Sequence, residues 1–267
     1  MIYFVATPIG NLKDITYRAI EVLNSVDVIA CEDTRNSLKL LNHYNISKKL
    51  IAYHKNNEII SSDGIINLAK QGKNIAVISD AGMPVISDPG NILIKKLIEE
   101  DIEFTVVPGA SASLSALLLS GMDSSKFTFV GFLNEQNRYR RQQLDMIKNY
   151  ETTLIFYVSP YNVKKDVESL YNILGDRKAC FVNEITKMYE KTIHFRLSEL
   201  PEMDIRGEYV LIVEGAAKQQ QTFEQTPKEQ LIELISSGVP KNDAIKQVAK
   251  QRGLAKNEVY KIAIDIK

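Results

Sequence analysis

Two charged segments of this sequence could do chemistry, and the first is CEDTR. Glu32, Asp33 and Arg35 follow a short apolar run that ends near Ala30. Charged side chains at the end of a buried strand lose hydration unless they pair, cap a helix or meet a ligand. A carboxylate here could take a proton from a hydroxyl group, and the planar guanidinium of Arg35 suits phosphate oxygens. The alternative is structural, with Asp33 or Thr34 capping a helix and Arg35 in a surface salt bridge.

The second charged segment is SDAGMPVISDPG, residues 79–90, which is rich in turn-forming residues. Its two Gly and two Pro residues make a stiff backbone that can approach a ligand closely. The carboxylate of Asp80 could accept a hydrogen bond from a sugar hydroxyl or an ammonium group. Asp88 precedes Pro89, and this pair is typical of a helix N-cap followed by Pro in the first turn. We therefore expect Asp80 to bind a ligand and Asp88 to cap a helix.

Two further segments combine Pro, Gly and small residues: TPIGNL at residues 7–12 and VPGASAS at residues 107–113. A structural turn explains the first equally well. In the second, small side chains at a helix start leave backbone N–H groups within reach of a ligand, although tight helix packing selects the same residues. Neither segment has the G-x-G-x-x-G spacing, and no G-x-x-x-x-G-K-[ST] loop occurs. An ordinary NAD or ATP site is therefore unsupported.

The elements that position these segments follow from the apolar pattern, which predicts an α/β protein. Each of the four segments comes directly after a predicted strand, which is where open α/β sheets bind ligands. The last two predicted strands have no helix between them, and this predicts an antiparallel pair in a mixed sheet. The predicted strands are 2–6, 28–30, 50–53, 74–79, 104–107, 127–130, 153–158, 178–182, 191–197 and 208–213, with helices at about 15–24 and 90–99.

Composition divides the chain into three parts. The segment MDSSK after Gly121 interrupts the α/β pattern, which predicts an N-terminal parallel α/β domain at residues 1–121 and a mixed α/β domain at residues 122–216. The polar stretch AAKQQQTFEQ then predicts a linker, so residues 217–267 form this linker and a helical tail. Breaks at SGVP and RG divide the tail into three short helices.

The overall composition excludes several classes of protein. Of 267 residues, 45% are hydrophobic and 25% are charged, the profile of an ordinary folded protein. Cys31 and Cys180 are far apart and the His residues lack ligand spacing, so we expect neither a disulfide nor a metal site. The apolar runs are too short to span a membrane, and the N-terminal residues lack the basic region of a signal peptide. We expect a cytoplasmic protein with no membrane partner.

A nucleic-acid site on this chain would have to be a local basic patch, because 33 Lys and Arg residues balance 33 Asp and Glu residues. The dense candidate is RYRR, where Arg138, Arg140 and Arg141 surround Tyr139. Guanidinium groups contact phosphates, and an aromatic ring stacks on bases. A solvated helix face is the alternative. The tail from residue 218 carries nine basic and six acidic residues, an excess of three that permits RNA docking.

Taken in order, ATPIGNLKDIT, CEDTR, SDAGMPVISDPG and VPGASAS resemble the tetrapyrrole methylase-like S-adenosylmethionine transferases. VGFLNEQNRYRR, TLIFYVSPYNV, NEITKMYE and RGEYVLIVEG follow in the expected order, so the resemblance covers about residues 1–215. It implies two α/β domains with the methyl donor, S-adenosylmethionine, in a cleft between them, and a short helical C-terminal extension. The resemblance also suggests a homodimer.

The EDTR and SDAG forms resemble the branch of this family that methylates RNA. This implies 2'-O-methylation of a cytidine in 16S ribosomal RNA of the small ribosomal subunit. Because the fold also hosts methylases of corrin precursors and diphthine synthase, methylation of a tetrapyrrole or another small acceptor is the alternative. A non-catalytic RNA-binding module is a second alternative.

The resemblance assigns a donor site by position. It places donor contacts on the first loop, the SDAG loop, the start of the VPGASAS helix and one strand end of the second domain. The residues are Pro8, Ile9, Gly10, Asp80, Gly82, Met83, Ser111, Ala112 and Tyr157. The NEITK segment is expected to close over the adenine together with Tyr157.

Methyl transfer to a ribose hydroxyl needs the oxygen, carbon and sulfur atoms in line and a base for the hydroxyl proton, but no metal. The candidate bases are Asp33, which we favour, and Glu32 in the first domain, with Glu184 and Lys187 from NEITK. Lys187 could serve only if its pKa were lowered. Arg35 and the RYRR residues are the expected RNA contacts.

Overall fold

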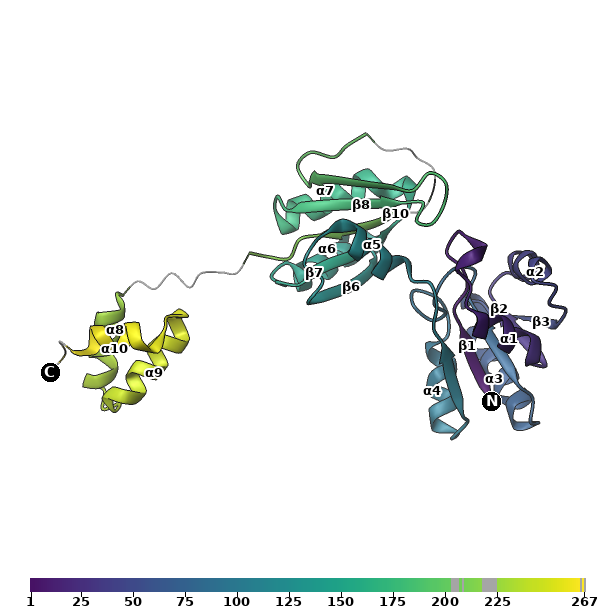
Figure 1. The fold of residues 1–267 in the computed structure, drawn as a ribbon, viewed down its shortest axis with the longest axis horizontal. Coiled ribbons are helices and arrows are strands. Elements are labelled where there is room, and N and C mark those ends of the chain that lie inside the picture. The colour runs from purple at the N-terminus through teal and green to yellow at the C-terminus, as the bar shows by residue number, and fades with distance from the viewer. Residues whose placement is uncertain (203–206, 208, 218–224, 265, 267) are drawn as a thin grey trace. The chain divides into compact units, whose positions relative to one another are not determined.

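The computed structural model describes residues 1–202, 207, 209–217, 225–264 and 266. The chain forms two compact units, Met1–Ala216 and Ala217–Lys267 (Figure 1). The first unit contains two β-sheets with helices on their faces, and the second is helical. The predicted α/β fold with a helical extension is therefore confirmed. In the described part of the chain, no helix has the length and apolar character needed to cross a membrane.

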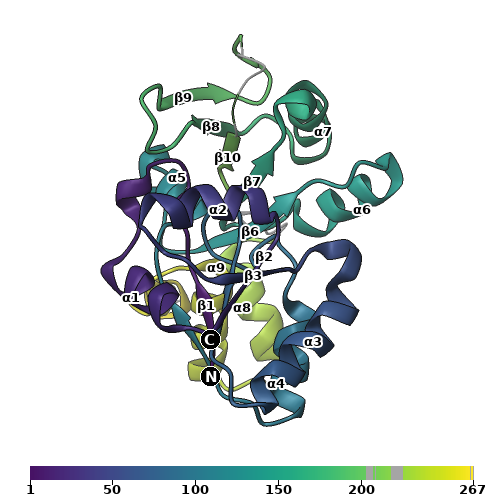
Figure 2. The same ribbon diagram turned by 90° about the vertical axis from the view of Figure 1, so that its right-hand side faces the viewer.

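The first sheet is built from β1 (Ile2–Val5), β2 (Val28–Cys31), β3 (Lys49–Ala52), β4 (Ile75–Ile78) and β5 (Phe104–Val107), with α1 (Tyr17–Ser25), α2 (Thr34–His43), α3 (Glu58–Lys70), α4 (Asn91–Glu99) and the short turns η1 (Leu12–Asp14) and η2 (Lys55–Asn57). All its strands are parallel, in the order β3-β2-β4-β1-β5. Alternate strand residues point to opposite faces, so Phe4 packs in one core cluster with Leu93 of α4, and Val5 in another with Leu41 of α2. Helices α3 and α4 lie side by side on the first of these faces (Figure 2).

The second sheet is built from β6 (Phe127–Phe132), β7 (Thr153–Val158), β8 (Lys178–Asn183), β9 (Lys191–Arg196) and β10 (Tyr209–Val213), with α5 (Ala112–Ser120), α6 (Asn137–Ile147), η3 (Pro160–Asn162) and α7 (Val163–Leu174). The strand order is β6-β7-β10-β8-β9. Strands β6 and β7 are parallel, while β10 runs antiparallel to both β7 and β8. The predicted mixed sheet is confirmed.

The predicted pairing of the last two strands is wrong. Strand β9 pairs with β8, and β8 separates it from β10. The burial patterns give the reason: every residue of β10 is buried, as in a central strand, whereas β9 alternates between exposed and half-buried residues, as an edge strand does. The sequences already show this difference, because YVLIV is apolar throughout and KTIHFR alternates polar and apolar residues. This pattern predicts a central position for β10 and an edge position for β9.

Helix α5 packs on the second sheet, although the predicted boundary at residue 121 assigns it to the first domain. Ala116 and Leu117 lie in one core cluster with Ile155, Val182 and Ile212 of the second sheet. Three of the four buried residues of this helix, Ser113, Ala116 and Ser120, have small side chains, so the helix fits closely against the strands. The packing of α5 therefore places the boundary between the two sheets in the connection between β5 and Ala112.

The tail forms the three predicted helices, α8 (Pro227–Ser236), α9 (Lys241–Arg252) and α10 (Lys256–Ile264). Thr226 and Glu229 form a reciprocal capping box at the start of α8, and Gly253 ends α9 in the left-handed conformation. Leu231, Val248 and Val259 are fully buried in a core that contains residues of the tail alone. The predicted linker at residues 216–225 lies mostly outside the described residues.

We predict that truncation after Ala216 leaves residues 1–216 folded, because each compact unit has its own apolar core. Thermal unfolding of the truncated chain, followed by circular dichroism, should remain a cooperative transition, and the isolated residues 217–267 should show helical signal. Insoluble protein after truncation would mean that the tail completes the core of the first unit.

Candidate functional site

The loops that follow β1, β4 and β5 meet at the carboxyl edge of the first sheet. The N–H of Thr7 donates to the carbonyl of Gly82 at 2.9 Å, and the N–H of Gly82 donates to the carbonyl of Thr7 at 3.1 Å. Gly82 has a φ of +79°, and a Cβ on it would lie 3.1 Å from the Ile9 side chain and 3.6 Å from the Ala110 carbonyl. A side chain at Gly82 would therefore strain the backbone and crowd two neighbouring loops.

The loop after β8 reaches this edge from the second sheet. A Cβ on Gly10 would lie 2.8 Å from side-chain carbons of Lys187 and 3.1 Å from the carbonyl of Ile185. Lys187 donates to Glu184 at 2.9 Å. Glu184 and Thr186 both have positive φ values, 52° and 68°, which non-glycine residues adopt at a cost. The structure thus brings together the first loop and the NEITK segment.

Asp80 is held by the segment CEDTR. Its Oδ1 accepts from the backbone N–H of Asp33 at 3.3 Å, and its Oδ2 accepts from the side-chain amide of Asn36 at 2.9 Å. The carboxylate is exposed but oriented, because both oxygens are tied to the start of α2. The two charged segments of the sequence therefore form one site and not two separate ones.

Asp33 takes the structural role that we set against the catalytic one. Its Oδ1 accepts from the backbone N–H of Arg35 at 2.8 Å, and its Oδ2 lies 2.8 Å from the Arg35 guanidinium, so it caps α2 and pairs with Arg35. The hydrogen bond from the Arg35 side chain, aided by its backbone N–H, lowers the pKa of Asp33 to about 2. A carboxylate with so low a pKa is a weak proton acceptor, and this counts against our preference for Asp33 as the base. The Arg35 side chain is 86% exposed.

The pKa values of Glu32 and Asp88 are shifted in the opposite direction to that of Asp33. Burial, with the nearby charge of Asp80, raises the pKa of Glu32. The pKa of Asp88 is raised to about 6, mainly by burial and further by the charges of Glu32 and Asp80. A hydrogen bond from Ser79 acts in the opposite direction and lowers it. Three carboxyl groups therefore influence one another at the ends of β2 and β4, and repulsion favours keeping a proton among them.

The predicted helix cap at Asp88 is wrong. Helix α4 begins at Asn91, with Gly90 at the N-cap position and a φ of +143°. Glu58 of α3 accepts from the N–H groups of Gly90 at 2.8 Å and Ile92 at 3.2 Å, so a side chain from another helix takes the capping role. This frees Asp88 to face the carboxyl groups of the site.

The other predicted donor residues have mainly packing and capping contacts. Ile9, Ala112 and Tyr157 all pack against one core cluster of the second sheet. Ser111 caps α5, accepting from the N–H of Leu114 at 3.5 Å. Pro8 is buried and Met83 is half-buried.

Sequence reasoning missed two buried oxygens, one at the last residue of β8 and one in the loop that follows. Among the described residues, the buried Oδ1 of Asn183 and Oγ1 of Thr186 have no hydrogen-bond partner. Such atoms cost free energy unless a ligand or water meets them. Both residues belong to NEITK. From the sequence we considered only the titratable residues of this segment, Glu184 and Lys187, and so left out the neutral ones.

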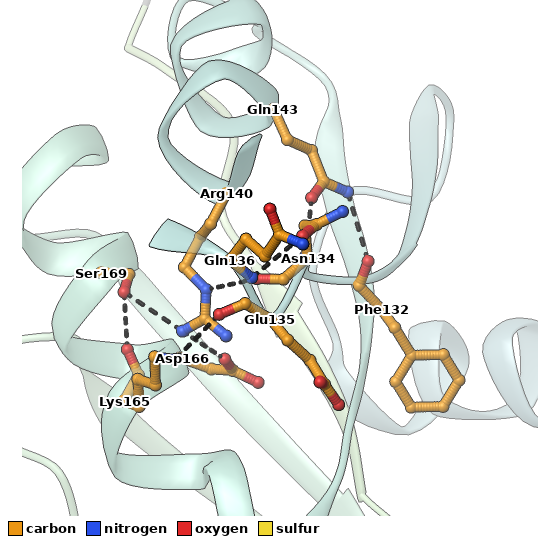
Figure 3. Close-up of polar contacts among 9 residues, drawn as sticks. All are labelled: Phe132, Asn134, Glu135, Gln136, Arg140, Gln143, Lys165, Asp166 and Ser169. Carbon is orange, nitrogen blue, oxygen red and sulfur yellow. Dashed lines mark hydrogen bonds and ion pairs between the residues drawn. The ribbon is translucent and has the colours of Figure 1, made fainter. Parts of the chain in front are cut away.

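The prediction that Arg140 belongs to an exposed basic surface is wrong. Arg140 is only 3% exposed, and its guanidinium lies 2.9 Å from Asp166 of α7. It also donates to the carbonyl of Asn134 at 2.8 Å and to Ser169 at 3.4 Å (Figure 3). The helical period explains this, because Arg140, Leu144 and Ile147 share the buried face of α6.

The other three residues of RYRR are exposed on α6. Arg138 and Arg141 are three residues apart, which places them on one helix face, and Tyr139 is 50% exposed. Arg141 has a weak, exposed ion pair with Asp145 at 3.8 Å. The structure therefore leaves two arginines and one ring of this motif available to a ligand.

The comparison with protein families shows which family this chain belongs to. A family described as "Tetrapyrrole (Corrin/Porphyrin) Methylases" matches residues 1–201. The chain belongs to the tetrapyrrole methylase family. The predicted family, and with it a methyltransferase as the class of enzyme, is confirmed.

Relatives similar to this methylase carry the name "Ribosomal RNA small subunit methyltransferase I". The proteins from Halalkalibacterium halodurans and Bacillus subtilis are each 42% identical to it, over 98% and 97% of this chain and 93% and 92% of theirs. The protein from Haemophilus influenzae is 40% identical over 99% of this chain and 96% of its own. The similarity thus includes the helical tail.

Solved structures show the same fold at low identity. A diphthine synthase has a TM-score of 0.63 and 14% identity, covering 80% of this methylase and 90% of that chain. A uroporphyrin-III-C-methyltransferase from Thermus thermophilus has a TM-score of 0.57 and 18% identity, covering 80% and 93%. These likenesses confirm the fold alone.

We predict that Asp166→Asn destabilises the protein by about 3–5 kcal/mol, because it leaves the buried Arg140 charge without a counter-ion. Urea unfolding of this variant should show a much lower midpoint. Arg140→Met combined with Asp166→Leu should recover most of the loss, and Arg141→Gln, on the exposed face, should change stability by no more than about 0.5 kcal/mol. An unchanged midpoint for Asp166→Asn would show that the ion pair does not hold α6 to α7.

Proposed function

We propose that this methylase transfers a methyl group from S-adenosylmethionine to the 2'-hydroxyl of a cytidine in small-subunit (16S) ribosomal RNA. The observation that carries the proposal is the identity of 40–42% with the named ribosomal RNA methyltransferases along nearly the whole chain. Relatives with the same name at this identity, aligned through both compact units, favour a shared acceptor over the small acceptors of the wider family. The protein would act in the cytoplasm on the small subunit, as a homodimer.

The residues at the edge of the first sheet fit the donor. The absence of a side chain at Gly82 and Gly10 lets the loops at this edge pack closely, because a Cβ on either residue would meet atoms of neighbouring loops. The oriented carboxylate of Asp80 suits the hydroxyls of a ribose, since both of its oxygens are already fixed in place. Asn183 and Thr186 offer buried oxygens that an adenine amino group could satisfy.

Further donor contacts come from Pro8, Ile9, Met83, Ser111, Ala112 and Tyr157, as the family resemblance implies. Bound S-adenosylmethionine supplies a methyl group on a positively charged sulfur. The contribution of the chain is to align that group with the acceptor oxygen and exclude water, which accounts for much of the acceleration of such a displacement.

We assign the proton acceptor to Glu32. Asp33 is engaged by Arg35 and has a pKa of about 2, and Lys187 is paired with Glu184. The carboxyl of Glu32 has a raised pKa because burial and the Asp80 charge disfavour its ionised form. A carboxylate with a raised pKa accepts a hydroxyl proton more readily than one held by a guanidinium. The charges of Asp80 and Asp33 act to raise its pKa, and that of His54 acts to lower it.

The RNA contacts on this neutral chain are local. Arg35 is exposed at the start of α2, and Arg138 and Arg141 are exposed on α6. Their guanidinium groups suit phosphate oxygens, and the ring of Tyr139 can stack on a base. Arg140 supports this surface from within, because its ion pair fixes the orientation of the helix that carries the others.

Ribose-methylation mapping tests the function. Small-subunit ribosomal RNA from a strain lacking this gene should lack one 2'-O-methylcytidine, and the purified protein with S-adenosylmethionine should restore it. Methylation of a macrocyclic precursor and not of RNA would establish the small-acceptor alternative. Donor binding without any transfer to the small subunit would support a non-catalytic role.

We predict that Glu32→Gln slows transfer by about 100-fold while donor affinity, measured by calorimetry, stays near that of the unmodified enzyme. Asp33→Asn is the matched control, because Asn also caps helices and Asp33 is not expected to move a proton. The rate of the unmodified enzyme should fall with decreasing pH as Glu32 becomes protonated, at a higher pH than an ordinary Glu would give. A slow Asp33→Asn variant beside a fast Glu32→Gln variant would return the base to Asp33.

A further inference from the structure

Two aromatic rings are exposed where the parallel strands β6 and β7 end. Phe132, the last residue of β6, is 57% exposed, and Tyr161 in η3, just after β7, is 86% exposed. Phe132 pairs in register with Tyr157, and their rings meet edge to face at 5.5 Å. Exposed large aromatic side chains at the carboxyl ends of two parallel strands need an explanation, because burial would stabilise them.

The chain around Phe132 is held rigidly. Gln143 of α6 donates to the carbonyl of Phe132 at 3.3 Å and accepts from the N–H of Asn134 at 3.1 Å. The buried Arg140 donates to the carbonyl of Asn134, and Lys165 of α7 donates to the carbonyl of Glu135 at 3.0 Å. Figure 3 shows the Phe132 ring pointing away from this network. The ring is therefore presented outward on a fixed backbone, which reduces the entropy cost of binding.

Several cations follow these rings along the chain. Arg138 and Arg141 on α6 and Lys164 and Lys165 on α7 are exposed, against the acidic Glu135 on the same loop. The helices that carry these cations begin directly after the segments that carry the rings. Rings with flat faces beside several cations match unpaired nucleotides, whose bases stack and whose phosphates attract cations. A duplex keeps its bases inside and offers the rings nothing to stack on.

We propose that Phe132 and Tyr161 form a base-stacking platform that holds unpaired nucleotides flanking the methylated residue. The inference rests on the proposed function and adds the class of substrate to it, a single-stranded RNA segment in place of a duplex. Both rings are exposed, so the platform contributes to RNA affinity. Because the Phe132 ring meets Tyr157, which we place among the donor contacts, Tyr161→Ala is the variant in which donor affinity should stay unchanged.

Tryptophan fluorescence tests the platform directly, because the chain contains no Trp. Phe132→Trp and Tyr161→Trp each introduce a single indole at the platform, and Tyr150→Trp, at the opposite end of β7, is the matched control. Single-stranded oligocytidylate should quench the first two indoles and leave the third unchanged. A GC duplex of the same length should quench none of them. Equal quenching by strand and duplex, or none by either, would overturn the proposal.

Affinity measurements give a second readout. Phe132→Ala and Tyr161→Ala should each weaken oligocytidylate binding by about tenfold with an unchanged salt slope, whereas Arg138→Gln with Arg141→Gln should flatten the slope. Unchanged affinity in both Ala variants would overturn the platform while leaving the methylation assay of the unmodified enzyme as the independent test of function. Sedimentation of the Ala variants tests whether a second copy of the chain binds at these rings instead. A loss of self-association would assign the rings to a contact between copies.

Discussion

The paired hydrogen bonds between Thr7 and Gly82 are the constraint on which the candidate site depends. They join the loops that follow β1 and β4, two neighbouring strands whose carboxyl ends would otherwise lead into independent turns. Because Gly82 has a left-handed φ, the SDAG loop turns toward Ile9 and Ala110 and leaves Asp80 directed toward α2. Val85 and Ser87 of the same loop also have positive φ values, 75° and 69°, which non-glycine residues adopt at a cost.

Electrostatics then separates carboxylates that look alike in the sequence. Glu32 and Asp33 are adjacent, yet burial raises the pKa of the first and Arg35 lowers the pKa of the second. Their positions differ, because Glu32 directly follows the buried strand β2 while Asp33 caps the next helix, where Arg35 reaches it. Two adjacent carboxyl groups therefore differ in use: that of Glu32 is suited to accept a proton, and that of Asp33 is suited to cap a helix.

The arginines of helix α6 also differ in role, according to the helix face on which they lie. Arg140 is buried against Asp166 and binds the carbonyl of Asn134, while Arg138 and Arg141 face solvent. A buried ion pair contributes little net stability over apolar residues, but it fixes one arrangement of α6, α7 and the loop after β6. The exposed ring of Phe132 owes its fixed position to this arrangement (Figure 3).

The sequence by itself determined the fold class, the order of the strands along the chain, the tail helices and the family, because apolar periodicity and ordered motifs are local properties. Tertiary structure alone decided that β8 lies between β9 and β10, that α5 packs on the second sheet, and that Glu58 and not Asp88 caps α4. It also decided the role of Arg140 and the unequal pKa values of Glu32 and Asp33. Each of these depends on which distant segment lies next to a residue, and burial and nearby charges are properties of that neighbourhood and not of the local sequence.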